Sequence, residues 1–110
     1  MDMNRVYSVI DTLYHTLLER KNASSESSYT AKLFSKGENH ILKKICEEAG
    51  ELCFAIKDNN IDEIIYESAD LTYHVLVALA FKDVNPDRVK QELARRFGIS
   101  GIEEKNSRES

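Results

Sequence analysis

Two pairs of acidic residues stand at equal distances on either side of a short polar turn at residues 58–60. Counted from the middle of this turn, Glu51 lies eight positions before it and Glu67 eight after. Glu48 and Asp70 each lie eleven positions away. If both flanks are helices folded back on each other, a rise of about 1.5 Å per residue puts the inner pair level, roughly 12 Å from the turn. The i,i+3 spacing within each pair keeps its members on one helix face. The sequence therefore predicts a helical hairpin with four carboxylates at one place.

Hydrophobic periodicity extends the helical prediction to the rest of the chain. Hydrophobic residues make up 42% of the 110 residues, with a single proline, which is typical of a helical globular domain. Apolar residues at steps of three and four predict helices at 4–20, 29–34, 38–57, 61–82 and 86–97. In the third of these, Cys46 and Cys53 join the apolar side, so we expect reduced thiols in the core. The predicted fold is an all-α, antiparallel bundle of about four to five helices.

The second half of the fourth predicted helix is apolar on nearly all sides. A lone helical domain of this size has few ways to cover residues 75–81, so we expect a second copy of the chain to cover them and a homodimer to result. Residues 1–110 are expected to form a single domain, in which 98–110 read as a polar tail. Because the sequence starts at Met1 without a preceding domain, we expect a monofunctional protein.

Charge and hydropathy exclude several function classes. The net charge is −4 and the isoelectric point is near 5.4, unlike the basic footprint of a nucleic-acid binder. The longest apolar run has seven residues, which is too short to cross a bilayer. The N-terminus lacks the apolar stretch of a signal peptide. These features predict a protein without nucleic-acid or membrane partners, in a cytoplasmic location.

A cluster of four carboxylates needs a cation, because like charges a few Å apart oppose each other's ionisation. Hard divalent ions with oxygen ligands suit such a site, and Mg²⁺ is the one we expect, bound by Glu48, Glu51, Glu67 and Asp70 as one or two ions. The alternative is a solvated acidic face. Either pair alone favours that alternative, but the equal distances from the turn and the flanking apolar stripes favour the metal site.

Carboxylate-bound Mg²⁺ accepts phosphate oxygens, which points to a phosphorylated substrate. The chain has no glycine-rich phosphate loop, so phosphate binding has to come from the metal and from basic side chains. The candidates are Lys32, Lys43, Lys44 and Lys57, although a surface role is open for each. His74 lies four residues after Asp70 on the same face, where a metal ligand, a substrate contact, an orienting group or a quietly packed histidine are all open.

These residues resemble a known pattern. Residues 47–51 (EEAGE), followed after fifteen residues by 67–70 (ESAD), resemble the E-E-x-x-E…E-x-x-D signature of the MazG-like superfamily of all-α nucleoside triphosphate pyrophosphatases. Within it, the chain is most similar to the phosphoribosyl-ATP pyrophosphatase family. The resemblance covers about residues 5–108 and includes 28–34 (SYTAKLF), 41–48 (ILKKICEE) and 69–77 (ADLTYHVLV).

The resemblance implies a dimer of packed helices that holds Mg²⁺ through the same four carboxylates. It implies hydrolysis of the α–β phosphoanhydride of 1-(5-phosphoribosyl)-ATP to 1-(5-phosphoribosyl)-AMP and pyrophosphate, the second step of histidine biosynthesis. Glu47 is then the candidate for orienting or deprotonating the attacking water. Two other readings stay open. One is a house-cleaning pyrophosphatase for ordinary or damaged dNTPs. The other is an acidic oligomerisation module without activity.

Overall fold

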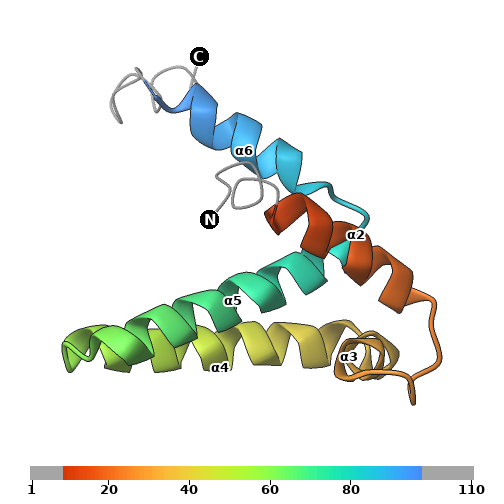
Figure 1. Cartoon of the computed structure of the whole chain (residues 1–110), viewed down its shortest axis with the longest axis horizontal. Helices are drawn as coiled ribbons and strands as arrows, with labels where there is room; N and C mark the ends of the chain where they lie inside the picture. Colours follow the sequence, from red (N-terminus) through yellow and green to blue (C-terminus); the bar gives the residue numbers. More distant parts are fainter. Residues whose placement is uncertain (1–8, 98–110) are drawn as a thin grey trace.

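The computed structural model describes residues 9–97, and over this range it contains five α-helices and no strand (Figure 1). The all-α prediction is confirmed. The helices, in chain order, are α2 (Val9–Lys21), α3 (Tyr29–Lys36), α4 (Glu38–Lys57), α5 (Ile61–Phe81) and α6 (Pro86–Arg95). They agree closely with the predicted ranges, although α6 ends two residues before Phe97. Two predicted segments lie outside the described residues: the start of the first helix at 4–8 and the polar tail at 98–110.

Side-chain caps define the starts of three helices. The side chains of Ser28, Asn60 and Asn85 each accept a backbone N–H at the start of α3, α5 and α6, which replaces a hydrogen bond that a helix start lacks. Pro86 follows Asn85 at the first helical position, where its missing N–H costs nothing. Gly37 separates α3 from α4 with φ 91°, a left-handed value that favours glycine.

The turn between α4 and α5 is tight enough to bring the two helices side by side. Asn59 has φ 56°, a left-handed conformation that asparagine tolerates better than most residues. The backbone N–H of Asn60 returns to the carbonyl of Ala55 at 3.2 Å, which closes the end of α4. The predicted hairpin is therefore present, with its turn where the sequence puts it.

Of the described helices, those outside the hairpin cover only one of its two ends. In Figure 1, α4 and α5 lie antiparallel along the long axis, with α2 and α3 against the end away from the turn. The apolar core lies there, between α2, α3, α4 and α5. Its buried members are Tyr14, Leu17, Leu33, Phe34, Ile41, Leu76, Val77 and Ala80. Lys21 of α2 joins this end by donating to the carbonyls of Ala80 and Phe81, both at 3.0 Å.

The expected apolar side of α4 is only partly buried. Ile41 is 1% exposed, but Leu42 and Ile56 are 48% and 53% exposed. Cys46 and Cys53 are free and exposed, so the prediction of core thiols is wrong for the single chain. The physical reason is that α3 covers α4 only near its start, α2 packs mainly on α3 and α5, and no described residue covers this side of α4 further along.

Helix α5 is the one described helix whose length and composition would allow it to cross a membrane, with a mean hydropathy of 1.3. Length and hydropathy alone are weak evidence for a membrane span, because the core helix of a soluble protein also meets both criteria. Here α5 has Leu76, Val77 and Ala80 buried against its neighbours and also carries the buried acid Glu67. The expectation that a second copy covers residues 75–81 is therefore wrong for these three apolar residues, because α2 and α3 cover them within the chain. We regard α5 as the central helix of the bundle.

Candidate metal centre

The hairpin brings the predicted acidic residues together. One carboxylate oxygen from each of Glu48, Glu51 and Glu67 lies within 4.8 Å of the others. Glu48 also groups with Asp70 and His74, again with ligand atoms within 4.8 Å of one another. Glu48 is common to both groups, so the four acids form one cluster across α4 and α5. The equal residue counts on the two sides of the turn produce this meeting, as the sequence predicts.

Two of these acids are buried, and each has one carboxylate oxygen without a hydrogen-bond partner. Glu48 is 4% exposed and Glu67 8%, and in each the Oε2 atom has no hydrogen-bond partner. An ionised carboxylate is costly to bury unless a cation or hydrogen-bond donors compensate it. The burial is a feature that sequence reasoning missed, because helical periodicity alone placed these acids beside the apolar stripe and not inside the hairpin.

Crowding and burial raise the proton affinity of these groups. The pKa of Glu48 rises from 4.5 to about 8, first because its protonated form would share a hydrogen bond with Asp70 and second because it is buried. Burial also raises the pKa of Glu67, and the neighbouring Glu51 raises it further. Without a cation, the cluster therefore prefers to hold protons. A bound divalent ion would remove that preference by supplying positive charge.

The donor set fits a hard divalent cation. Glu48, Glu51, Glu67 and Asp70 offer only carboxylate oxygens, and the unpartnered oxygens of Glu48 and Glu67 provide ligand positions already free of hydrogen bonds. Mg²⁺ prefers oxygen ligands and keeps several waters when carboxylates bind it. Glu51 is exposed, so one side of the cluster is open to solvent and to a substrate.

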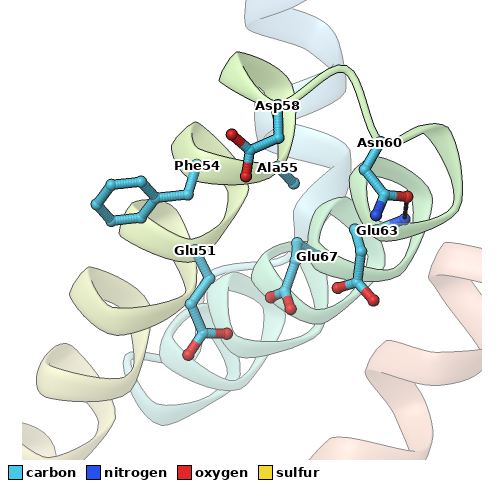
Figure 2. A pocket seen from close by; sticks show the side chains of 7 residues that line it. All are labelled: Glu51, Phe54, Ala55, Asp58, Asn60, Glu63 and Glu67. Atoms are coloured by element: carbon cyan, nitrogen blue, oxygen red, sulfur yellow. Dashed lines mark hydrogen bonds between the residues drawn. The ribbon is translucent and has the colours of Figure 1, made fainter.

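The cluster continues toward the turn as an open, acidic pocket of about 250 Å³ (Figure 2). Figure 2 shows Glu51 and Glu67 reaching toward each other from the two helices, while Phe54 points away from them. Asp58 and Glu63 add two further carboxylates to the lining. These two were not predicted, although Glu63 stands four residues before Glu67 and the helical repeat places both on one face.

The predicted lysines differ in their relation to the acids. Lys44 lies 3.3 Å from Glu47 and 3.6 Å from Glu48, measured from Nζ to the nearest carboxylate oxygen. Lys43 reaches Glu47 at 3.9 Å from a far more exposed position. The other two predicted lysines, Lys32 and Lys57, are exposed and make no ion pair with any residue in the described range. Of the four predicted lysines, Lys44 is therefore the one that the fold brings to the buried acid Glu48.

His74 lies beside the cluster but is 2% exposed. Its Nδ1 atom is 2.8 Å from the backbone carbonyl of Asp70, and its Nε2 atom is 3.4 Å from the hydroxyl of Tyr29. Sequence periodicity does not single out Tyr29, because it sits in the first turn of a short helix forty-five residues away. Only packing of α3 against the hairpin brings Tyr29 to His74.

Comparison with known proteins supports the same chemistry. The sequence pattern described as phosphoribosyl-ATP pyrophosphohydrolase matches residues 10–97. The chain belongs to this family. The match spans both halves of the acidic hairpin and all five described helices apart from the first residue of α2.

Individual relatives agree with the family assignment. A phosphoribosyl-ATP pyrophosphatase of Geotalea daltonii is 52% identical over 101 residues, covering 92% of this chain and 95% of the relative. That of Trichlorobacter lovleyi is 53% identical, covering 96% and 98%. The histidine biosynthesis bifunctional protein HisIE of Wolinella succinogenes is 64% identical over 107 residues, which cover 97% of this chain but 47% of that protein. The chain thus spans about half the length of the bifunctional relatives it matches.

Proposed function

We propose that this protein hydrolyses 1-(5-phosphoribosyl)-ATP between its α- and β-phosphates, which yields 1-(5-phosphoribosyl)-AMP and pyrophosphate in histidine biosynthesis. The supporting observation is a pair of buried carboxylates, Glu48 and Glu67, that meet across the hairpin of a chain in this family, each with one oxygen that has no hydrogen-bond partner. A nucleotide triphosphate carries its own negative charge into an acidic site, so the reaction requires a cation as a bridge.

Mg²⁺ is the cofactor that we propose, held by Glu48, Glu51, Glu67 and Asp70 as one or two ions. When bound, it would offset the charge that develops on the departing pyrophosphate and increase the acidity of a bound water. The four acids are the groups that fix its position, and the pair on α4 and the pair on α5 do so from rigid helices.

Activation of the attacking water and binding of the substrate phosphates are proposed for side chains around the cluster. Glu47 is exposed and placed beside Glu48, so we propose that it orients or deprotonates the attacking water. We propose that Lys44, whose Nζ lies 3.6 Å from Glu48, contacts a substrate phosphate next to the proposed metal ligands. Lys43, Lys32 and Lys57 are proposed as outer contacts for the phosphates, and His74 as a group that acts beside Asp70.

We also propose that the chain works as a homodimer. An apolar outer face lies along the hairpin, on the side that helical periodicity places away from Glu51 and Glu67. Its exposed members are Leu42, Cys46, Cys53, Ile56, Ile61 and Ile65. No described residue covers this face, and apolar patches of this kind are typical of protein interfaces. A second hairpin packed on it would complete a helix bundle.

The domain and its location complete the proposal. Residues 1–110 are proposed to form one domain, of which the family pattern covers 10–97. A soluble enzyme that acts on a charged nucleotide of amino-acid biosynthesis is proposed to work in the cytoplasm.

A substrate panel tests the proposed activity. Pyrophosphate release is measured with phosphoribosyl-ATP, ATP and the four dNTPs, each with Mg²⁺ and with EDTA. We expect a kcat/KM for phosphoribosyl-ATP at least about 100-fold above that for any dNTP, because a site that hydrogen-bonds the extra ribose discriminates strongly against ligands without it. EDTA should abolish turnover.

Two other results would replace the proposal. A preference for dNTPs would indicate a house-cleaning pyrophosphatase. No turnover of any nucleotide, together with no rise in melting temperature on adding Mg²⁺, would indicate a non-catalytic helical module, since an ion that binds only the folded state must stabilise it.

A further inference from the structure

The contact between Tyr29 and His74 joins α3 to the back of the acidic cluster. Tyr29 is in the first turn of α3, and its hydroxyl lies 3.4 Å from Nε2 of the buried His74 on α5. On its other side, His74 has Nδ1 at 2.8 Å from the carbonyl oxygen of Asp70. The three residues form a chain of polar contacts that ends at the backbone of Asp70, a proposed metal ligand whose Oδ1 atom lies 3.7 Å from the same Nδ1.

The direction of both hydrogen bonds follows from chemistry. A backbone carbonyl can only accept, so Nδ1 of His74 must carry the hydrogen that it donates to Asp70. In a neutral imidazole the other nitrogen then has a lone pair and no hydrogen. The Tyr29 hydroxyl is therefore the donor to Nε2.

Packing holds these groups in place. The rings of Tyr29 and His74 meet edge to face, with centroids 6.4 Å apart at 84°. Tyr73 packs on His74 in the same manner at 5.3 Å, and its hydroxyl bonds Thr30, the residue after Tyr29. Ser28 caps this turn by accepting the N–H of Ala31 at 3.0 Å. The first turn of α3 is thus fastened to α5 at two adjacent residues.

We propose that Tyr29 is a positioning residue for the metal centre: through His74 it fixes the orientation of Asp70 and so tightens the binding of the divalent ion. This rests on the proposed metal site. Burial raises the pKa of Tyr29, while the charge of nearby Lys44 opposes the rise, so the hydroxyl stays a neutral donor close to that ammonium. Replacing a group that orients a metal ligand typically weakens metal binding by about 10- to 100-fold.

The test compares Tyr29→Phe with Tyr66→Phe by Mg²⁺ titration, followed through the melting temperature and by calorimetry. Phenylalanine keeps the ring packed on His74 and removes only the hydroxyl. We expect Tyr29→Phe to raise the Mg²⁺ dissociation constant about tenfold. Tyr66, on α5, is exposed to a similar degree as Tyr29 (65% against 55%) but makes no hydrogen bond in the described range, so Tyr66→Phe should leave the dissociation constant within twofold.

Nitrogen-15 NMR of the histidine rings supplies a readout that a merely structural role would not change. The Nδ1–H tautomer is expected for His74, and its Nε2 resonance should move toward that of an unbonded nitrogen in Tyr29→Phe but not in Tyr66→Phe. In a double-mutant cycle with His74→Gln, the two effects on Mg²⁺ affinity should be far from additive, because both changes break one chain of contacts.

Three outcomes would overturn the proposal. Unchanged Mg²⁺ affinity in Tyr29→Phe would mean that the tyrosine only packs. Tighter affinity would mean that His74 itself binds the ion through Nε2 and that the hydroxyl competes with it. The Nε2–H tautomer in the wild type would reverse the proposed hydrogen bonds. None of these measurements needs the substrate, so they are decided separately from the proposed hydrolysis.

Discussion

The two halves of the α4–α5 hairpin are built in opposite ways. In the half that α2 and α3 cover, apolar side chains such as Ile41 and Val77 are buried, as in an ordinary helix bundle. In the half toward the turn, Glu48 and Glu67 lie between the helices while Ile61 and Ile65 are 65% and 64% exposed. The first half stabilises the fold, and the second is arranged around charge.

The half toward the turn is inverted, with acids inside and apolar side chains outside. This inverted half needs two interactions that the hairpin alone does not supply. Carboxylates between helices need a cation inside the hairpin, and apolar residues outside it need a covering surface. A single pair of helices cannot supply either of these. The difference between the halves therefore links the proposed metal and the proposed second copy to the same physical cause, which is that this part of the chain is incomplete by itself.

The largest expected effect comes from removing a carboxylate in the inverted half. Glu51→Ala and Asp70→Ala should each lower kcat/KM for phosphoribosyl-ATP at least about 1,000-fold, a loss of about 4 kcal/mol of transition-state stabilisation. Pyrophosphate release at saturating Mg²⁺ measures this, and circular dichroism should show unchanged helicity. Glu19→Ala, an exposed acid on α2, is the matched control and should retain full activity. Mg²⁺-dependent activity close to wild type in both site variants would refute the site.

The next effect comes from the covered half. Ile41→Ala should lower the free energy of unfolding by about 3 kcal/mol, because it leaves a cavity in the core shared by α2, α3 and α5. Ile41→Val, which removes one methylene group, should cost only about 1 kcal/mol. Urea denaturation monitored by circular dichroism measures both. Equal costs for the two variants would show that this end of the hairpin is not a close-packed core.

A smaller effect is expected at the outer face. Ile65→Asp places a charge on the proposed interface and should weaken dimerisation at least about 100-fold, roughly 2.7 kcal/mol, as followed by analytical ultracentrifugation. Gln91→Asp on the exposed side of α6 adds the same charge elsewhere and should leave the dimer intact.

Thiol labelling gives an independent reading of the same surface. Cys46 and Cys53 are exposed in the single chain, so they should react quickly with Ellman's reagent in Ile65→Asp and slowly in a wild-type dimer. Rapid labelling of both cysteines in a wild-type dimer would place the interface on another face.

The smallest expected effect is a pH dependence of stability without metal. Glu48 has an ordinary pKa of 4.5 and a pKa of about 8 in the fold, so between these values the folded state holds a proton that the unfolded chain has released. The metal-free protein should therefore lose several degrees of melting temperature as pH rises from 5 to 8.

Two comparisons check this assignment. Saturating Mg²⁺ should make the melting temperature nearly independent of pH between 5 and 8, because the ion binds the deprotonated cluster. Glu48→Gln should do the same in the metal-free protein. Stability that rises with pH over this range in the metal-free wild type would contradict the raised pKa.

Much of the hairpin could be predicted from local features of the sequence. Helical periodicity, the capping residues Asn60 and Asn85, and the turn at 58–60 depend on neighbours in the chain, so helix bounds follow within a few residues. The meeting of Glu51 and Glu67 follows as well, since equal counts on antiparallel helices mean equal heights.

Other features depended on where distant helices pack. The sequence by itself determined an all-helical chain with acids gathered in one hairpin. Only the tertiary structure decided that Glu48 and Glu67 are buried, that Cys46 and Cys53 are exposed, and that Tyr29 reaches His74. The physical reason is that periodicity defines the faces of a helix, whereas burial depends on which of those faces another helix covers.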